Sequence, residues 1–284
     1  VDIPIVGDVK EVLTEMIAMI KETSTRPDPA ALGGWWEAIE GWRKRDCLKY
    51  KPGSGEIIKP QYVVETLWTM TKDVETYITS DVGQHQMWAA QHFGFHEPNK
   101  WLTSGGLGTM GYGLPAAIGA QLAYPGALVI DIAGEASIQM NIQELGTATQ
   151  YRLPVKVFII NNEYMGMVRQ WQELNHGGRY SESYSDSLPD FVKLAEAYGW
   201  KGITIDGPDD LDAGIQAMID HPGPVMVDCR VAKLANCFPM IPSGASHTDM
   251  ILRPPMSAAR PMMMRRLWSD EASSFRTAHA VDPG

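Results

Sequence analysis

A buried strand that leads through a glycine into a carboxylate is the feature that most constrains the fold. Residues 127–133 are almost wholly apolar, and Gly134 and Glu135 follow them directly. The next apolar run, residues 155–160, ends in two asparagines. Apolar runs of this length, separated by helical patterns, are typical of neighbouring strands in a parallel sheet. The acid and the amides are therefore expected at one edge of that sheet, where ligands bind in such folds.

The alternation of apolar runs and helical patterns extends over most of the chain. Units of about 30 residues that alternate in this way predict an α/β fold with a doubly wound, mostly parallel sheet and helices on both faces. We expect helices over residues 60–71, 85–92, 112–123, 137–149, 189–198 and 209–220, and strands over residues 75–80, 127–132, 155–160, 201–205 and 224–229.

The regular alternation occupies residues 60–252, which we interpret as the main domain. Residues 1–24 are expected to hold a short strand and a helix, too little to form a core, and therefore the tail of a preceding domain. Residues 25–59 read as a helical linker, with a tryptophan-containing helix over residues 35–47. The tail 253–284 has no helical or strand period and is expected to be disordered; a membrane-binding or partner-binding arm is the alternative.

Charge and cysteine content exclude several classes of partner. The 284 residues carry a formal net charge of −10, which argues against nucleic acid and anionic membranes as partners. No apolar run approaches the length of a membrane span, and no targeting segment is seen, so a cytoplasmic protein is expected. Cys47, Cys229 and Cys237 lack metal-type spacing and are expected to be reduced. An anionic cofactor would therefore need a metal, backbone amides and helix dipoles.

The expected sheet edge offers oxygen ligands for a divalent metal. Mg²⁺ prefers octahedral oxygen ligands from one or two side chains, carbonyls, water and phosphate. The protein would supply three of these ligands, from Glu135, the Asn162 side chain and the Tyr164 carbonyl. The backbone around Ser137 would offer N–H groups at the start of a helix. The alternative is a capped turn beside an asparagine-rich loop.

A glycine-rich loop and two short segments add candidate ligand contacts. Five glycines between residues 105 and 113 indicate a loop whose backbone meets a ligand, although the loop lacks the ending of a Walker motif. In this loop Met110 either wedges under a flat ring or belongs to the core. The residues from Gly83 to His85 end a strand at the same edge and either bind phosphate or cap a helix. Met167 and Trp171 share one helical face, which is either core or a substrate pocket.

Together these segments closely resemble acetohydroxyacid synthase, also called acetolactate synthase. The glycine, the acid and the asparagine pair resemble the thiamine diphosphate motif, with matching spacing from Gly134 to Asn161. The family resemblance also rests on the runs at residues 83–91, 101–120, 140–145, 166–171 and 237–244 and covers about residues 1–252.

The resemblance implies roles for individual residues. The Mg²⁺ ligands would be Glu135, Asn162 and the Tyr164 carbonyl. The Gly108 carbonyl would accept a hydrogen bond from the cofactor's amino group, and Met110 would support its bent conformation. Substrate would meet Met167 and Trp171. The diphosphate would be contacted by Gly83, Gln84, His85, Ala136, Ser137, Met165 and Gly166, with Gly134 opening the motif.

The resemblance also implies an activity. It implies thiamine diphosphate-dependent decarboxylation of pyruvate and transfer of the two-carbon unit to a second 2-oxoacid, pyruvate or 2-ketobutyrate, in branched-chain amino acid biosynthesis. A homodimer or tetramer, a regulatory subunit and an FAD-type middle domain are implied for the family's full-length chain. The activating glutamate is implied in a domain that this sequence lacks, so the chain alone is expected to be inactive, with no catalytic residue of its own.

One departure from the family leaves alternatives open. The family has aspartate at the position of Glu135, and the extra methylene moves the carboxylate by about 1.5 Å against a strict octahedral geometry. Either the backbone adjusts or metal affinity falls. The alternative functions are therefore another thiamine diphosphate decarboxylase or oxidase, and a non-catalytic remnant or assembly module.

Overall fold

The computed structural model describes residues 2–24, 26, 28–51 and 57–252. The chain forms two compact units, Val1–Lys49 and Tyr50–Gly284. The expected tail 253–284 lies outside the described residues. The predicted assignment of residues 1–24 to a preceding domain and of residues 25–59 to a linker stays a prediction.

The first unit consists of two helices with exposed side chains. Helix α1 spans Val9–Glu22 and α2 spans Pro29–Arg43, and neither contains a buried residue. The Asp8 carboxylate accepts from two backbone N–H groups and so starts α1, while the Asp28 carboxylate accepts from the Ala30 N–H and starts α2. The predicted short strand is wrong, because residues 2–8 form no strand. The tryptophan-containing helix also begins earlier than expected, since Pro29 fits its first turn.

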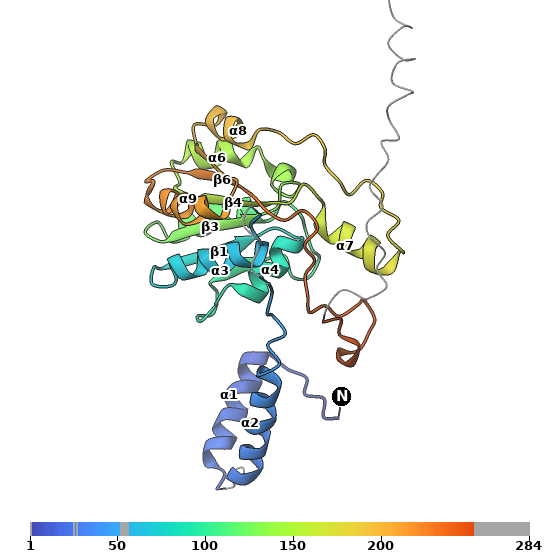
Figure 1. Ribbon diagram of the computed structural model, residues 1–284. Coiled ribbons are helices and arrows are strands. Elements are labelled where there is room, and N and C mark those ends of the chain that lie inside the picture. Colours follow the sequence, from blue (N-terminus) through green and yellow to red (C-terminus); the bar gives the residue numbers. More distant parts are fainter. Residues whose placement is uncertain (1, 25, 27, 52–56, 253–284) are drawn as a thin grey trace, which may run out of the picture. The chain divides into compact units, whose positions relative to one another are not determined.

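The second unit is built on a six-stranded sheet. Its order is β2-β1-β3-β4-β6-β5, and every neighbouring pair is parallel (Figure 1). This confirms the predicted parallel α/β fold. The strands are β1 Thr76–Ser80, β2 Trp101–Thr103, β3 Leu128–Ala133, β4 Lys156–Asn161, β5 Lys201–Ile205 and β6 Val225–Arg230.

Most of the predicted helices are found, and one is broken. The stretch expected as a helix over residues 137–149 is a 3₁₀ turn, η1, followed by the short helix α6. The Asn141 side chain lies at this junction and donates to the Gly111 carbonyl at 2.6 Å, a bond that ties the turn to the glycine-rich loop. The elements are α3 Pro60–Thr71, α4 Gln84–His92, α5 Gly113–Ala123, η1 Ile138–Asn141, α6 Glu144–Gln150, α7 Gly166–Asn175, α8 Phe191–Ala197, α9 Pro208–Asp220 and η2 His247–Asp249.

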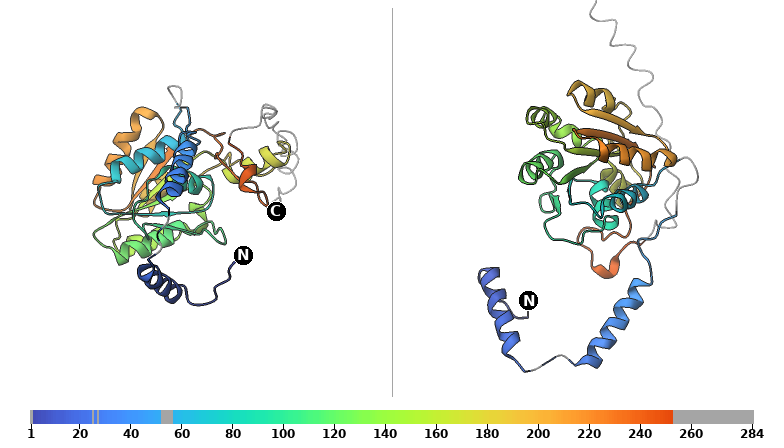
Figure 2. Two further views of the ribbon diagram at one scale, coloured as in Figure 1. Left: turned by 90° about the horizontal axis from the view of Figure 1, so that it is seen from below. Right: turned by 90° about the vertical axis from the view of Figure 1, so that its left-hand side faces the viewer.

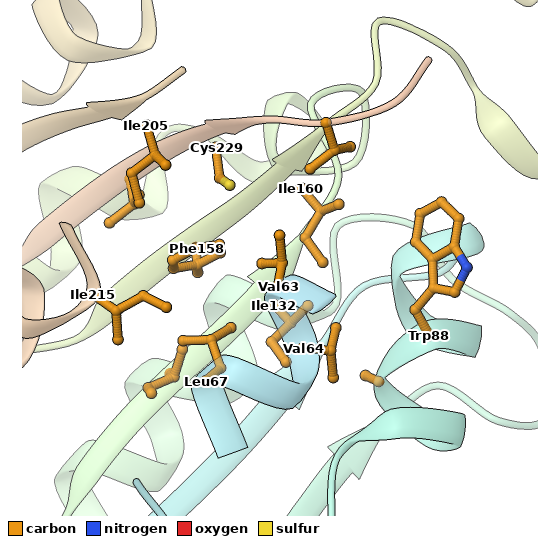
Figure 3. Close-up of a cluster of buried hydrophobic side chains, with 14 of the residues drawn as sticks. Val63, Val64, Leu67, Trp88, Ile132, Phe158, Ile160, Ile205, Ile215 and Cys229 are labelled. Atoms are coloured by element: carbon orange, nitrogen blue, oxygen red, sulfur yellow. The ribbon is translucent and has the colours of Figure 1, made fainter. Parts of the chain in front are cut away.

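Two buried clusters, one on each face of the sheet, hold the second unit together. On one face, α3, α4 and α9 pack on alternate strand residues; Figure 3 shows Leu67 and Ile215 directed toward Phe158. On the other face, α5, α6 and α8 contribute Leu114, Leu145 and further apolar side chains. Helices therefore cover both faces, as the turned views in Figure 2 also show. Successive residues of a strand point to opposite faces of the sheet, so the apolar residues of each strand are divided between the two clusters.

The strand order determines where a ligand can bind. After β1 the chain adds β2 on one side of that strand, and it then returns to add β3 on the other side. The connections that follow β1 and β3 consequently diverge at the carboxyl ends of these strands. In open α/β sheets such a reversal creates the crevice in which ligands bind.

Within the part of the chain that the structure describes, no helix combines the length and the apolar character needed to cross a membrane. Cys47, Cys229 and Cys237 are free, and the last two are buried.

Candidate functional site

The segments after β1 and β3 and the glycine-rich loop meet around Val82. The Ser137 hydroxyl donates to the Val82 carbonyl at 3.2 Å. On the loop, Gly108 adopts a φ of 69°, and a Cβ built on it would lie 3.7 Å from the Val82 side chain. Three of the predicted cofactor segments are therefore brought together, although they are distant in sequence.

Glu135 presents a buried carboxylate with an unused oxygen. Its side chain is 1% exposed, and Oε1 has no hydrogen-bond partner among the described residues. Burial raises the pKa of this carboxyl to about 7, while the backbone N–H groups of Glu135 and Asn162 act in the opposite direction. The carboxylate thus lies against the backbone of the predicted second ligand. A buried carboxylate oxygen without a partner is costly unless the group is protonated or a cation is bound.

Gln84 connects the segment after β1 with the segment after β4. The Asn162 Nδ2 donates to Gln84 Oε1 at 3.0 Å, and Asn162 Oδ1 accepts from the backbone N–H of Tyr164 at 3.2 Å. A Cβ on Gly166 would lie 2.0 Å from Gln84 Oε1, so the backbone that begins α7 packs directly against this side chain. The predicted residues Asn162, Tyr164 and Gly166 are thereby assembled on one side of the site.

His85 fills the space between the glycines that follow β1 and β3. A Cβ on Gly83 would lie 2.8 Å from the His85 ring, and a Cβ on Gly134 would lie 2.7 Å from its Nδ1. Burial lowers the pKa of His85 to about 4, with the Asp81 backbone opposing the shift, so the ring is neutral at pH 7. Its Nε2 has no partner among the described residues. The ring can therefore offer a hydrogen bond to a ligand without a positive charge.

The remaining cofactor candidates lie beside these residues in the chain. Ala136 and Met110 are partly buried, and the Met165 backbone N–H donates to the Ser183 carbonyl at 2.8 Å. The η1 turn is only four residues long, so a full helix dipole is not available at Ser137, contrary to the expectation of a long helix there.

Met167 and Trp171 line a cavity of about 630 Å³ at α7 and the turn that follows it. The other lining residues are Val168, Gln172, His176 and Arg179. None of the predicted metal ligands lines this cavity. His176 and Arg179 were missed by the sequence reasoning, since no periodic pattern marks the turn after α7.

Polar residues behind the site were also missed. Gln170 is 0% exposed and accepts from the Gln84 side chain at 2.8 Å. Asp81 and Asp131 are both buried near the start of α5. Their partners lie far away in the sequence, and no local pattern marks them.

The geometry fits a diphosphate and a metal. Two buried polar atoms, Glu135 Oε1 and His85 Nε2, lack partners among the described residues, and Gly134, the residue before Glu135, packs against the His85 ring. Among the residues that the structure describes, no group of three or more histidine, cysteine, aspartate or glutamate side chains could hold a metal. Any metal at Glu135 would consequently rely on amide, carbonyl and ligand oxygens, which is the habit of Mg²⁺.

Residues 81–229, just over half of the chain, match the model of the family described as "Thiamine pyrophosphate enzyme, C-terminal TPP binding domain". The chain belongs to this thiamine pyrophosphate enzyme family. The match begins at Asp81, directly after β1, and ends at Cys229 in β6, so it contains every candidate cofactor residue. The thiamine pyrophosphate domain predicted from the motif between Gly134 and Asn161 is confirmed.

Curated relatives of this thiamine pyrophosphate enzyme are acetolactate synthases. The chain is 49% identical over 254 residues to the acetolactate synthase isozyme 3 large subunit of Escherichia coli (strain K12). The matched region covers 88% of this chain and 44% of that protein. The chain is 47% identical over 256 residues to the acetolactate synthase large subunit of Haemophilus influenzae, covering 90% and 44%. For the Pyropia yezoensis large subunit the identity is 48% over 250 residues, covering 88% and 42%.

These similarities confirm the resemblance to acetolactate synthase that the sequence motifs predicted. The chain spans less than half of the length of the curated relatives that it matches.

Proposed function

We propose that this chain is the cofactor-binding part of an acetolactate synthase, which decarboxylates pyruvate and transfers the two-carbon unit to a second 2-oxoacid. One observation carries the proposal: the buried Glu135 carboxylate has an oxygen without a partner among the described residues, and it faces the Asn162 backbone. The family match and the acetolactate synthase relatives support the cofactor and the reaction class.

Mg²⁺ would be held by Glu135, the Asn162 side-chain oxygen and the Tyr164 carbonyl. The Asn162 amide is already oriented, because its Nδ2 is fixed by Gln84 and its oxygen lies at the turn that carries Tyr164. A divalent cation would be held at the unpartnered Glu135 oxygen and would help to neutralise the charge of the diphosphate.

The diphosphate would lie against Gly83, Gly134 and Gly166, with Gln84 and His85 next to it. Side chains at these glycine positions would collide with Gln84 or His85, so glycine is what allows these two side chains to pack against the backbone beside the proposed diphosphate site. The backbone around Ala136 and Ser137 would add N–H donors. Met165 would lie beside the diphosphate, and its own N–H already donates to the Ser183 carbonyl. Since His85 is neutral and the chain carries a net charge of −10, the metal and the backbone amides would balance the diphosphate charge.

The bound cofactor would supply the electron sink that pyruvate decarboxylation requires. This chain's residues would orient it: the Gly108 carbonyl would accept from its amino group, and Met110 would pack under its ring. The open cavity at Met167 and Trp171 would take the 2-oxoacid. Product analysis distinguishes this function from that of a plain decarboxylase, because the former yields acetolactate or acetohydroxybutyrate and the latter yields an aldehyde.

The assembly of the full enzyme is part of the same proposal. The relatives bear the name "large subunit", which favours a regulatory small subunit as a partner. We further infer a homodimer or tetramer, FAD in the rest of the enzyme and a cytoplasmic location, all from the resemblance to the family.

Calorimetric titration of thiamine diphosphate into the purified chain, with and without Mg²⁺, tests the proposal. Binding that requires Mg²⁺ is expected for the unmodified chain. Glu135→Asp should retain it, because a carboxylate remains, and Glu135→Gln should weaken it by about tenfold or more, because a charge-assisted ligand is lost. Binding that is equal in all three variants would contradict the ligand role of Glu135. No binding by the unmodified chain or by Glu135→Asp would favour the non-catalytic alternative.

A further inference from the structure

Two buried carboxyl groups lie side by side against the start of α5, and the proposed cofactor contacts do not use them. Asp131 belongs to β3 and is 0% exposed, and Asp81 directly follows β1 and is 1% exposed. In the sheet register, Thr79 of β1 stands opposite Asp131. Each carboxyl has one oxygen, Oδ2, without a hydrogen-bond partner among the described residues. Buried carboxyls of this kind require a structural explanation.

Both carboxyl groups act on Gly113, the residue at which the glycine-rich loop becomes α5. The Gly113 N–H donates to Asp81 Oδ1 at 2.7 Å. The Gly113 carbonyl lies 2.9 Å from the Thr79 hydroxyl, which lies in turn 3.1 Å from Asp131 Oδ1. A Cβ at position 113 would be 2.1 Å from Asp131 Oδ1. Gly113 is thus held at its N–H, at its carbonyl and by direct packing.

The two short contacts of the Thr79 hydroxyl, to the Gly113 carbonyl and to Asp131 Oδ1, point to a proton on Asp131. A hydroxyl has a single proton to donate, and a backbone carbonyl can only accept. When the Thr79 hydroxyl donates to Gly113, its oxygen can interact with Asp131 only as an acceptor, so Asp131 must be the donor. An ionised Asp131 would instead compete for the same proton and bury an uncompensated charge.

The charges around Asp131 point in the same direction. Burial and the negative charge of Asp81 hold the pKa of Asp131 well above its usual range. A Thr79 hydroxyl that donated to Asp131 would lower this pKa, whereas a hydroxyl that donates to the Gly113 carbonyl leaves the shift unopposed. No charged side chain occurs in α5, and β4 places Val157 opposite Asp131. Other titratable groups on this face are Tyr77, which stacks on Tyr124, and Glu144, which accepts from Thr147. Tyr198 packs on the same buried cluster, and Asp228 of β6 stands opposite Ile159 of that cluster. None of the described groups offers Asp131 a compensating positive charge.

We propose that Asp131 is a positioning residue that works as a neutral carboxylic acid. It donates a hydrogen bond to the Thr79 hydroxyl and, together with Asp81, fixes Gly113. In this way it holds the glycine-rich loop in place for the cofactor. The last part rests on the proposed function. Gly108 and Met110, the candidate cofactor contacts, lie five and three residues before Gly113, so a shift of this anchor would displace them.

The pH dependence of stability tests the proton without any cofactor. Asp131→Asn stays neutral and keeps an N–H donor for Thr79. In the unmodified chain, the folded state keeps a proton that the unfolded aspartate releases above its ordinary pKa of 3.8. The proton's contribution to the free energy of unfolding is fully present below pH 3.8. It is lost as the pH rises from there toward the raised pKa of Asp131 in the folded state. The folding constant of the unmodified chain relative to Asp131→Asn should therefore fall with pH, by up to about tenfold per pH unit.

Urea unfolding of both proteins between pH 5 and 8 measures that ratio, and a ratio that does not change with pH would overturn the proposal. Infrared spectroscopy gives a second reading that does not need the Asp131 variant to fold. In the Glu135→Gln background, the band of a protonated carboxyl group should persist at pH 8. Its absence there would equally overturn the proposal.

Binding of thiamine diphosphate with Mg²⁺ tests the effect on the loop. Thr79→Val removes the hydroxyl that connects Asp131 with Gly113 and should weaken binding by about tenfold, whereas Thr79→Ser should restore it to within about twofold. Equal binding by the valine variant would overturn the role in positioning the loop. If the unmodified chain binds no cofactor, the proposed function fails, while the stability and infrared measurements still decide the protonation of Asp131.

Discussion

The protonation of Glu135 should control metal binding. Without a metal, burial keeps the pKa of this carboxyl at about 7, whereas a metal ligand must be ionised. Binding of Mg²⁺ should therefore release a proton, and affinity should rise by up to about tenfold per pH unit below pH 7 and level off above pH 8. Titration of Mg²⁺ in the presence of thiamine diphosphate at pH 6, 7 and 8 measures this dependence.

The same shift has a consequence for the metal-free protein. The pKa of Glu135 is higher in the folded state than the ordinary glutamate value of 4.5. The contribution of Glu135 to the free energy of unfolding is therefore fully present below pH 4.5 and is lost as the pH rises through 7. Mg²⁺ with the cofactor should consequently raise the melting temperature more at pH 8 than at pH 6. An affinity that is constant from pH 6 to 8, with an equal thermal shift, would contradict a carboxylate ligand at this position.

Gly166 should tolerate no side chain. An added Cβ would approach Gln84 Oε1 to 2.0 Å and Asn162 Nδ2 to 2.9 Å, which forces the Gln84 side chain away from its hydrogen-bond partners. Gly166→Ala should therefore lose Mg²⁺-dependent cofactor binding by about tenfold or more and cost about 1–3 kcal/mol of stability. Calorimetry and urea unfolding measure the two effects.

Gly119→Ala is the matched control for that substitution. Gly119 lies in α5, and its added Cβ would meet no atom within 4 Å. Because alanine also favours a helix more than glycine does, this variant should be unchanged in binding and stabilised by about 0.4–1 kcal/mol. Similar losses in both variants would indicate a general sensitivity to substitution and would remove the argument for close packing at Gly166.

At the scale of elements, Gln170 of α7 joins three separate segments. Its Oε1 accepts from Gln84 at 2.8 Å and from the Cys237 backbone N–H at 2.8 Å, and its Nε2 donates to the Cys237 carbonyl at 3.0 Å. Gln170→Met, of similar volume, would leave these buried groups unsatisfied. We expect a loss of about 1–3 kcal/mol in the free energy of unfolding, measured in urea.

Gln216→Met supplies the control for Gln170. Gln216 lies on α9, where its exposed side chain donates to Asp220 one turn away. Its replacement should change stability by no more than about 0.5 kcal/mol. If Gln170→Met proved equally neutral, the hydrogen bonds among α4, α7 and the segment around Cys237 would not stabilise the fold, and the fixed position of Gln84 would need another cause.

The sequence predicted correctly those helices and strands whose ends are marked by residues close to them in the chain. Helix α3 was predicted over residues 60–71 and spans Pro60–Thr71, because proline starts it and apolar spacing continues to its end. Strand β2 was missed, since its three residues are only partly buried and pair with β1 alone. The helix expected over residues 137–149 was wrong because Asn141 bonds to the backbone of a loop 30 residues away.

The same distinction holds for the candidate site. The convergence of Glu135 with Asn162 followed from strand ends in a parallel sheet, and the contact of the Glu135 carboxylate with the Asn162 backbone agrees with it. Gln170 and Asp131 were not foreseen, because their partners Gln84 and Thr79 lie 86 and 52 residues away. Which residues bind the metal and the cofactor stays a prediction that the titrations above address.

At the scale of the whole molecule, the two units differ in what stabilises them. Both buried clusters consist of residues from Ile58 onward, so the second unit contains a core on each face of its sheet. Neither helix of the first unit has a buried residue, and Leu13, Ile17 and Trp36 expose half or more of their surface. Exposed apolar side chains on helices of this kind favour association and aggregation.

Removal of residues 1–49 should therefore leave the second unit stable. The deletion removes no side chain from either core, and changes outside a core are usually within about 0.5 kcal/mol, or about 2 °C in melting temperature for a domain of this size. The shortened chain should also bind thiamine diphosphate with Mg²⁺ as the full chain does, because every candidate ligand follows Val82. Solubility should rise, since the exposed apolar helices are gone. Differential scanning calorimetry and the same titration measure these quantities. A fall of more than about 5 °C would show that α1 and α2 stabilise the sheet domain, and the two cores would then be insufficient by themselves.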